Sequence, residues 1–386
     1  METICEYEKC TGCFACQNVC PRKCIKLVSD KFGELHPQIN QDLCIDCGLC
    51  IKKCPARTEP RWEVPIGCYA VWNKNEKDRR LSASGGVATC FSQYMIKNKN
   101  GIVYGVKWDK QLGSVFFDKV TSISDLEALK GSKYVQAYVN FKYKEVGVDL
   151  QSGKNVLFIG TPCQIAGLKS FLGKDYDNLF TCDLLCHGVP SPDYLSGEIK
   201  RILGRKIGLA TNCRFRGNDK YNYNFSLWNN GKVLYNKRAF LSYYFTAFLT
   251  SITLRESCYS CRYASERRIS DITLGDFIGL GKLYPFTGNA HNASVVVLNT
   301  SKGEYFFSEF RNSMQNLYIE KREYEEAVQG GESFRKPVKR NIKRDKFLVL
   351  YEKYGWEKAI TKVLWKYIFR NTLMAELKKL LHKKSF

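Results

Sequence analysis

The chain has 386 residues, of which 44% are hydrophobic and 13% aromatic, and its formal net charge is +22. This length and apolar content can fill the cores of two or three domains, which excludes a disordered or low-complexity chain. No apolar run is long enough to span a bilayer. The start, METICEYEKC, lacks the features of a signal peptide, so we expect a cytoplasmic protein that is at most peripheral at a membrane.

Cysteines dominate the first part of the chain: twelve of the eighteen lie in the first ninety residues. Without an export signal, they indicate metal ligands rather than disulfides. Residues 10–21, CTGCFACQNVCP, and residues 44–55, CIDCGLCIKKCP, both follow the pattern C-x2-C-x2-C-x3-C-P. This is the ligand run of bacterial two-cluster ferredoxins, in which the fourth cysteine of each run reaches the other cluster.

The exchange of the fourth cysteine predicts two [4Fe-4S] sites. Their ligands are Cys10, Cys13, Cys16 and Cys54 for one cluster, and Cys44, Cys47, Cys50 and Cys20 for the other. Zinc also binds C-x2-C pairs, but it does not explain two identical four-cysteine runs. Cys5, Cys24, Cys68 and Cys90 lie outside the pattern, and we expect them to be small buried residues.

Beyond residue 65, short apolar stretches alternate with helical patterns. Buried strands are predicted within residues 99–108, 154–160, 178–192, 269–279 and 292–300. After the second strand the chain turns into a helix at Thr161–Pro162–Cys163. This alternation favours an α/β domain with a mixed or parallel sheet, whose ligands would lie beyond the carboxyl ends of the strands.

A second group of cysteines occurs at these strand ends. Cys163 and Cys186 follow two of the strands, and Cys258 and Cys261 form the C-x2-C pair of CYSC. Four such cysteines can make a tetrathiolate site. The spacing leaves open whether Cys182 replaces one of them and whether the metal is zinc. It assigns no role to Cys213.

The last 52 residues are strongly basic, with sixteen Lys and Arg against four Asp and Glu in residues 335–386. A helix is predicted from Glu357 to Leu381. Its apolar stripe comprises Ile360, Val363, Leu364, Tyr367, Ile368, Met374, Leu377 and Leu381. Lys358, Lys362, Lys366 and Arg370 form a basic row on another face. This helix could pack on the body, lie on an anionic membrane surface or dock on an acidic partner; no motif indicates nucleic acid binding.

Six segments in order resemble one family. They are LSASGGVATCF (81–91), KGSKYVQ (130–136), GTPCQIAGL (160–168), LLCHGVPSP (184–192), CYSCRYAS (258–265) and RISDITLGDFIG (268–279). Together they resemble the beta subunit of coenzyme F-420-reducing hydrogenase and of related formate dehydrogenases. The resemblance covers about residues 65–310, behind the fused cluster module.

The resemblance implies a third [4Fe-4S] cluster and a flavin, for which the family favours FAD while the sequence leaves FMN open. It places Cys163, Cys186, Cys258 and Cys261 as ligands of the third cluster. It also implies flavin contacts at Gly85, Gly86, Ser132, Lys133, Tyr134, Asp271, Thr273, Gly275 and Asp276. The glycine pair would let backbone amides approach a phosphate at a helix start, although SGG and GDFIG could also be only tight turns.

The predicted organisation is an α+β ferredoxin-like two-cluster module, an α/β domain with a mixed sheet, and a basic helical C-terminal tail. The ranges are 1–62 for the module, 65–155 and 156–330 for the two regions of the α/β domain, and 331–386 for the tail. The first region would bind the flavin, and the second would hold the third cluster and contribute to the flavin site.

Two functions fit this organisation. The first is a flavin-dependent reductase that takes electrons from ferredoxin or another redox partner and reduces a small-molecule or lipid-linked substrate. The resemblance points to coenzyme F-420 as substrate, but fold-level analogy does not fix a substrate. The second is a non-catalytic electron-transfer subunit of a larger complex; a third reading leaves the body as a scaffold. His187 is a candidate proton donor, with hydrogen bonding to the backbone or a cluster sulfur as the alternative.

Overall fold

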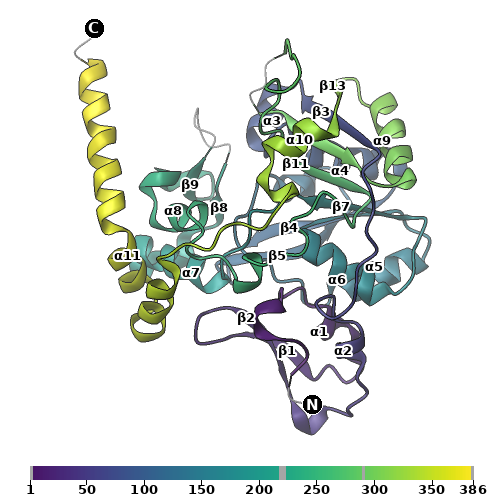
Figure 1. Cartoon of the computed structure of the whole chain (residues 1–386), viewed down its shortest axis with the longest axis horizontal. Helices are drawn as coiled ribbons and strands as arrows, with labels where there is room; N and C mark the ends of the chain where they lie inside the picture. The colour runs from purple at the N-terminus through teal and green to yellow at the C-terminus, as the bar shows by residue number, and fades with distance from the viewer. Residues whose placement is uncertain (1–2, 217–222, 289–291, 384–386) are drawn as a thin grey trace.

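The computed structural model describes residues 3–216, 223–288 and 292–383. Figure 1 shows a small N-terminal module at the bottom, a larger α/β domain above it, and a long C-terminal helix at one side. The small N-terminal domain and the α/β domain with a mixed sheet were both predicted from the sequence, and the structure confirms them.

The N-terminal module repeats one backbone pattern. Its elements are a hairpin and two short helices: β1 (Ile25–Ser29), β2 (Leu35–Ile39), α1 (Ala15–Val19) and α2 (Leu49–Lys52). Each helix follows a loop with left-handed backbone at two positions, Gly12 and Phe14 in the first run and Asp46 and Gly48 in the second. Positive φ angles so close together make a tight loop, so the cysteines of each run project from one curved backbone.

Eight strands of the described chain form one mixed sheet in the order β13-β3-β12-β11-β7-β6-β4-β5. They are β3 (Gly67–Asn73), β4 (Ile102–Asp109), β5 (Ser114–Val120), β6 (Val156–Gly160), β7 (Leu179–Leu184), β11 (Ile272–Asp276), β12 (Ser294–Leu298) and β13 (Leu317–Arg322). The central strands β4, β6, β7 and β11 are parallel, and the outer pairings are antiparallel. The five predicted strands are all present, and regions 65–155 and 156–330 contribute strands to the same sheet.

Helices cover both faces of the sheet. They are α4 (Val87–Lys99) and α9 (Ser301–Ser313) on one face, and α5 (Lys142–Gln151) and α6 (Pro162–Leu172) on the other. Because strand side chains alternate, Tyr104 enters the core beneath α5 and α6, whereas Val103 enters the core beneath α4 and α9. Burial on both faces explains why the central strands are apolar throughout.

The carboxyl ends of the parallel strands lie together along one side of the sheet, its carboxyl edge, and predicted functional segments such as that of Cys163 follow these ends. At this edge β6 leads directly into α6. Thr161 and Gln164 form a reciprocal capping box at the start of α6, and Pro162 occupies its first turn. The capping box fixes the direction in which the chain leaves β6 and therefore the position of Cys163.

A second, smaller sheet lies in the segment between β7 and β11. Its elements and the neighbouring helices are β8 (Asn212–Arg214), β9 (Asn224–Asn229), β10 (Lys232–Arg238), α7 (Pro192–Leu203) and α8 (Tyr243–Leu249). Two further short helices, α3 (Glu76–Leu81) and α10 (Tyr324–Gly330), follow β3 and β13. Phe215, Phe225, Tyr244 and Phe245 pack their rings together and join the small sheet to α8.

The C-terminal tail is helical, as predicted, but its helix begins earlier than Glu357. Helix α11 spans Arg344–Lys383 and is broken at Gly355, whose φ of 71° is left-handed. Directly after the break, the Trp356 indole N–H donates to Glu198 of α7 at 2.9 Å. Over the described residues, none of the helices combines the length and apolar character needed to cross a bilayer.

The predicted apolar stripe of α11 packs on the body over only half its length. Its first members are buried or partly buried: Ile360, Val363, Leu364, Tyr367 and Ile368. Met374 and Leu377 are 50% and 45% exposed, while the side chain of Leu381 lies outside the described part of the chain. The reason is that the body ends near Asn371, which donates to the Phe240 carbonyl; beyond this level α11 stands clear of α8 and β9 (Figure 1).

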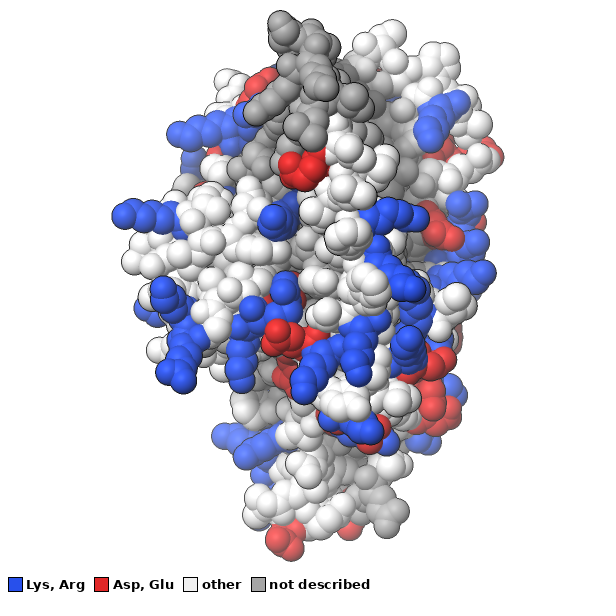
Figure 2. All heavy atoms as spheres, turned by 90° about the vertical axis from the view of Figure 1, so that its left-hand side faces the viewer, with Lys and Arg blue, Asp and Glu red and all other residues white. Residues whose placement is uncertain are grey.

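The predicted basic row of α11 is exposed. Its members are Lys358, Lys362, Lys366 and Arg370. Figure 2 shows the side of the molecule on which α11 lies, where Lys and Arg side chains are more abundant than Asp and Glu.

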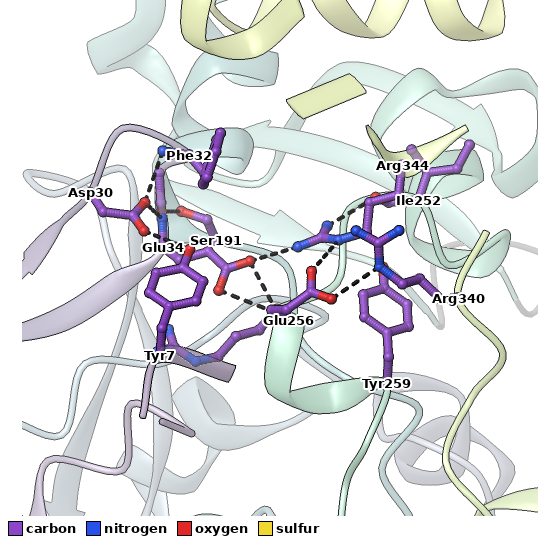
Figure 3. A network of polar contacts seen from close by, with 12 residues as sticks. Tyr7, Asp30, Phe32, Glu34, Ser191, Ile252, Glu256, Tyr259, Arg340 and Arg344 are labelled. Carbon is purple, nitrogen blue, oxygen red and sulfur yellow. Dashed lines mark hydrogen bonds and ion pairs between the residues drawn. The ribbon is translucent and has the colours of Figure 1, made fainter. Parts of the chain in front are cut away.

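A buried network of charges connects the tail, the body and the N-terminal module (Figure 3). Arg344, which is 1% exposed, pairs with Glu34 of the module at 2.7 Å and with Glu256 of the body at 2.9 Å. The Glu256 backbone N–H donates to the Glu34 carboxylate at 3.0 Å, and Arg340 pairs with Glu256 at 3.0 Å. The Tyr259 ring centroid lies 5.0 Å from the Arg344 guanidinium. Three distant segments therefore meet around one arginine.

The turn between β1 and β2 presents Glu34 to this network. The Asp30 carboxylate accepts hydrogen bonds from the backbone N–H groups of Phe32 and Glu34, at 2.9 and 2.8 Å. Gly33 has a left-handed φ of 77°, and its carbonyl accepts a hydrogen bond from the Ser191 hydroxyl. The turn is thus held both by its own aspartate and by the body.

Replacing Arg344 with methionine should lower the free energy of unfolding by about 3–5 kcal/mol, because Glu34 and Glu256 would lose a buried partner. The measurement is chemical denaturation of the anaerobically purified protein. Lys343→Met, at an exposed position one residue away, is the matched control and should change stability by less than about 0.5 kcal/mol. Equal stability of the Arg344 and Lys343 variants would contradict the role given to the network.

Acidification should also weaken the wild-type fold through Glu34. Burial opposes its charge, but the hydrogen bond with His36 and the charges of Arg255 and Arg344 lower its pKa below the ordinary glutamate value. A carboxylate with a lowered folded-state pKa stabilises the fold above its unfolded pKa, and this contribution is lost as the pH falls. Glu34→Gln should therefore flatten the acid limb of the stability–pH curve, and an unchanged limb would contradict this account.

Candidate redox centre

Two hollows in the N-terminal module are lined by cysteines. The first contains Cys10, Cys13, Cys16 and Cys54, and the second contains Cys20, Cys44, Cys47 and Cys50. In each hollow three cysteines come from one run and the fourth comes from the other, which is the grouping that the spacing predicts. Four thiols around a space suit a [4Fe-4S] cube, so the donor sets fit the predicted clusters.

Cys5 and Cys24 lie closer to these hollows than the sequence indicates. Cys5 borders the first hollow, and its hydrogen bonds with Cys10 and Cys54 raise its pKa. Cys24 borders the second hollow, with its sulfur 3.3 Å from that of Cys20. The sequence predicts that both are ordinary small buried residues. Cys24 is buried but borders a hollow, and Cys5 is only half-buried. By contrast, Cys68, Cys90, Cys182 and Cys213 lie buried in the apolar cores of the large domain.

The structure brings the third predicted set of cysteines together. Burial raises the pKa of Cys163 to about 11 and that of Cys186 to about 12, and repulsion from neighbouring thiolates of the set contributes. Burial likewise raises the pKa of Cys258 and Cys261. Gly188 lies between two members: its N–H donates to the Cys186 sulfur, and a Cβ added to it would lie 3.4 Å from the Cys258 sulfur. Cys182 is not among them, because it points into the core beneath α4 and α9.

Two buried arginines flank the third set. Arg255 and Arg268 are each 2% exposed. The charge of Arg255 opposes the burial-induced rise in the pKa of Cys163, and that of Arg268 does the same for Cys186 and Cys261. A tetrathiolate cluster is anionic, so buried cations beside the thiols suit such a group.

Zinc is the alternative that the sequence spacing left open for the third set. Within the described ranges, no three His, Cys, Asp or Glu residues form a group arranged to hold a metal ion. The ligand assignments for all three sets therefore stay predictions that rest on grouping and on charge.

The first hollow lies against the third set. Helix α1 packs on α6, and a Cβ added to Gly167 would lie 3.1 Å from the Cβ of Cys13. The Tyr143 hydroxyl is 2.9 Å from the Cys13 carbonyl oxygen and 2.8 Å from that of Gln164. Cys47 of the second hollow is instead exposed. The first hollow therefore adjoins the third set, and the second hollow is exposed at Cys47.

Arg255 spans the junction between the first hollow and the third set. Its Nε donates to the Cys10 carbonyl at 2.7 Å, and a terminal nitrogen lies 3.1 Å from His36 Nε2. Cys258 lies near enough for its thiolate to raise the pKa of Arg255, against the effect of burial. One buried positive charge thus faces cysteines of two sites.

The glycine pair predicted for the flavin lies at the carboxyl edge of the sheet. The Gly85 N–H donates to Ser294 Oγ at 2.9 Å, and a Cβ added to Gly85 would lie 2.4 Å from the Val71 carbonyl oxygen. Close packing on β3 and β12 therefore suffices to explain Gly85. Gly86 has φ of 79° and precedes α4, so the first amides of this helix face the edge, as a phosphate-binding turn requires.

Asp276 ends β11 at the same edge. Its carboxylate pairs with Arg216 at 2.9 Å and accepts a hydrogen bond from the Tyr223 hydroxyl at 3.0 Å. A Cβ added to the preceding Gly275 would lie 2.5 Å from a Leu185 side-chain atom, so close packing requires glycine there. The Arg216–Asp276 pair places opposite charges where the resemblance predicts a flavin contact.

Residues 132–134 lie close to this ion pair. Burial raises the pKa of Tyr134. The charge of Arg216 lowers this pKa and that of Asp276 raises it, and a hydrogen bond with Ser132 lowers it as well. The Tyr134 ring stacks on Phe248 with centroids 4.6 Å apart. The structure therefore brings Gly275, Asp276 and residues 132–134 to one region.

Lys133 is a buried amine in that region. Burial and the charge of Arg214 lower its pKa to about 7, while its Nζ donates to the carbonyls of Leu129 and Lys130 at 2.7 and 2.9 Å. Its contacts are thus with the backbone of its own loop.

Asp271 and Thr273 do not join the other predicted flavin residues. Asp271 lies at the opposite end of β11 and accepts hydrogen bonds from the Thr181 backbone and hydroxyl. Thr273 is fully buried and hydrogen bonds to Arg268 and Asn299. The motif around β11 is continuous in sequence, but a strand separates its ends by about 3.3 Å per residue.

His187 is held in place by neighbouring groups. Its Nε2 lies 3.3 Å from Ser251 Oγ, and its ring meets Phe248 edge-on at 5.2 Å. Burial lowers its pKa, which favours the neutral ring at neutral pH. Phe248 therefore contacts both His187, beside the third set, and Tyr134, beside the Arg216–Asp276 pair.

The sequence reasoning missed the residues that link these sites: Arg216, Arg255, Arg268, Tyr143 and Phe248. Two of them had a signal in the sequence: Arg268 opens the segment RISDITLGDFIG that contributes to the resemblance, and Arg255 lies three residues before the C-x2-C pair. The other three lie outside the quoted segments.

Comparison with known proteins assigns the two parts of the chain. Residues 153–326 match the family model for the C terminus of the coenzyme F420 hydrogenase/dehydrogenase beta subunit, and residues 9–58 match the 4Fe-4S dicluster domain. Residues 153–326 therefore carry the C-terminal domain of the coenzyme F420 hydrogenase/dehydrogenase beta subunit, with a 4Fe-4S dicluster domain in front. The predicted resemblance is thus confirmed.

Individual relatives match parts of the chain. The coenzyme F420-dependent sulfite reductase of Methanocaldococcus jannaschii is 26% identical over 197 residues, which are 49% of this chain and 30% of the relative. NADH-quinone oxidoreductase subunit I 2 of Geobacter metallireducens is 38% identical over 53 residues, 12% of this chain and 40% of the relative. The chain therefore spans less than half the length of these relatives.

A solved structure also aligns with the chain. It is a chain of the F420-reducing [NiFe] hydrogenase complex from Methanosarcina barkeri, with 15% identity and a TM-score of 0.46. The alignment covers 79% of this chain and 93% of that chain.

Changing Cys163 and Cys258 together to serine should remove one cluster, about four iron atoms per chain. Iron and acid-labile sulfide would be measured after anaerobic purification. Cys182→Ala is the control: this buried residue of the sheet should leave iron unchanged. If C163S/C258S retains the wild-type iron content, or C182A loses iron, the third ligand set is wrongly assigned.

Proposed function

We propose that this protein is an iron–sulfur flavoprotein oxidoreductase. It passes electrons from a ferredoxin-type donor through the two clusters of its N-terminal module and a third cluster to FAD, and on to an acceptor. Clusters exchange single electrons, whereas a bound flavin exchanges one or two, which suits it to link a one-electron carrier with a two-electron substrate.

The observation that carries this proposal is the spatial order of the sites. The second hollow lies at the surface, where Cys47 is exposed, and the first hollow packs against α6 beside the third cysteine set. From the third set, Phe248 leads to Tyr134 and the Arg216–Asp276 pair. A scaffold with no electron transfer has no need of such a continuous sequence of sites.

The chain's own residues would hold the flavin at the carboxyl edge of the sheet. The proposed candidates are Gly86, Ser132, Lys133, Tyr134, Gly275 and Asp276, together with Arg216, which pairs with Asp276. Ligands of open α/β sheets bind at such edges. Asp271 and Thr273 are left out of this set because their hydrogen bonds lie inside the domain.

The acceptor is proposed only as a class: a small soluble or lipid-linked metabolite that takes two electrons. Reduction of a deazaflavin such as coenzyme F420 is one candidate, since the name of the sulfite reductase relative includes this coenzyme. That relative shares 30% of its length with this chain, and a shared fold does not fix a substrate.

A second candidate function is a non-catalytic electron-transfer subunit. The observation that favours it is that this chain matches only part of the sulfite reductase relative. The matched region is less than a third of that protein. The fused cluster module favours the reductase instead, because it gives the chain its own electron inlet.

Composition tests the proposal first. Anaerobically purified protein should contain about twelve iron atoms and one flavin per chain, measured by iron assay and by the absorption of the released flavin. Eight iron atoms and no flavin would leave only the dicluster module and contradict the proposed path. Asp276→Asn should lower the flavin content without changing the iron, whereas Asp271→Asn, if it folds, should leave the flavin content unchanged.

Turnover separates the two candidate functions. The purified chain alone, supplied with reduced methyl viologen, should oxidise the dye when coenzyme F420 or another two-electron acceptor is added. Oxidation that occurs only after a partner subunit is added would identify an electron-transfer subunit.

Arg255 should set the potential of the clusters on either side of it. Arg255→Gln removes a buried positive charge, which should lower the reduction potential of a neighbouring cluster by on the order of 50 mV, because the reduced form is the more negative one. EPR-monitored redox titration measures this shift. Arg255→Lys, which keeps the charge, should restore most of the potential; equal shifts in both variants would contradict an electrostatic role.

A further inference from the structure

The outer face of helix α11 carries a row of exposed apolar side chains. Trp365, Phe369, Leu373 and Leu377 follow one another at intervals of four residues and are 50%, 65%, 51% and 45% exposed. This spacing places them on one side of the helix over a length of about 18 Å. Trp365, Phe369 and Leu373 lie outside the stripe that packs on the body, and Leu377 belongs to the distal part of that stripe, which does not pack. Large apolar side chains gathered in this way mark an interaction surface.

Cations accompany the apolar row on the same side of the helix. Lys366 and Arg370 each directly follow a member of the row, and Lys362 lies one turn before them; all three are exposed. The Lys366 ammonium lies 5.6 Å from the centroid of the Trp365 ring. Figure 2 shows further Lys and Arg side chains across this side of the molecule. The face therefore combines apolar and positively charged groups at every turn.

We propose that this face of α11 docks on an anionic lipid bilayer, with the helix lying in the plane of the interface. Trp, Phe and Leu side chains would enter the boundary between headgroups and acyl chains, while lysine and arginine stems stay with the apolar layer and their charges reach lipid phosphates. Residues 335–386 carry sixteen Lys and Arg against four Asp and Glu, so an anionic surface attracts the whole tail.

A bilayer suits this face better than an acidic protein. The centres of protein interfaces are depleted in charged residues, whereas here the cations run alongside the apolar row. The outer half of α11 also stands clear of the body in Figure 1, so a broad flat surface can reach it. Docking does not depend on the proposed redox function, because it involves neither the cysteine sites nor the sheet edge.

Vesicle binding of the full chain tests the proposal. The probes are vesicles of phosphatidylcholine alone and vesicles with about one third phosphatidylglycerol, and the readout is the fraction of protein that sediments with them. The wild type should bind the anionic vesicles and not the zwitterionic ones, and 1 M NaCl should weaken binding because it screens surface charge. A wild type that sediments equally with both vesicles, or with neither, overturns the proposal. Neither result bears on the iron and flavin content that tests the redox function.

Matched variants assign the binding to this face. W365S/F369S and K362E/K366E/R370E should each reduce partitioning onto anionic vesicles by about tenfold or more. The controls change equally exposed residues elsewhere: L112S/V148S for the apolar pair and K110E/K154E/K321E for the cations. All changed side chains are exposed, and circular dichroism verifies that the variants fold. Wild-type binding by either helix variant, or an equal loss in its control, overturns the assignment.

Discussion

The arrangement of this protein depends on burying Arg344 between two glutamates. Glu34 comes from the hairpin of the N-terminal module, and Glu256 lies two residues before Cys258. A buried guanidinium is stable only where carboxylates surround it, so the tail, the module and the loop of the third cysteine set must adopt one relative position. That position in turn sets the approach of the first hollow to the third set.

Buried arginines have the same function elsewhere in the molecule. Arg255 satisfies a carbonyl of the first cysteine run and faces Cys258, and Arg268 pairs with Asp183 beside the third set. These cations lie where the thiols would otherwise concentrate negative charge. Hydrophobic packing forms the sheet and its helices, and a few buried charged groups act together with the packing of α1 on α6 to place the redox sites.

The sequence predicted what is encoded locally. The two cysteine runs specify their own loops, and alternating apolar stretches located the five strands and the turn at Cys163. Position along a strand was harder to predict, because Asp271 and Asp276 belong to one continuous motif yet lie at opposite ends of β11. Cys5 and Cys24 show a related limit: their spacing suggests no ligand role, and only the folded module places them at the hollows. Long-range ion pairs such as Glu34–Arg344 leave no pattern in the sequence.

The contact between Glu34 and Arg344 joins residues that are 310 positions apart in the chain. During synthesis the N-terminal module emerges first, and it can close its own hairpin and helices at once. Its docking partner Arg344 emerges only after all strands of the large sheet have been made. Until Arg344 has been made, the face of the module around Glu34 therefore lacks this contact, and the Glu34 carboxylate remains hydrated.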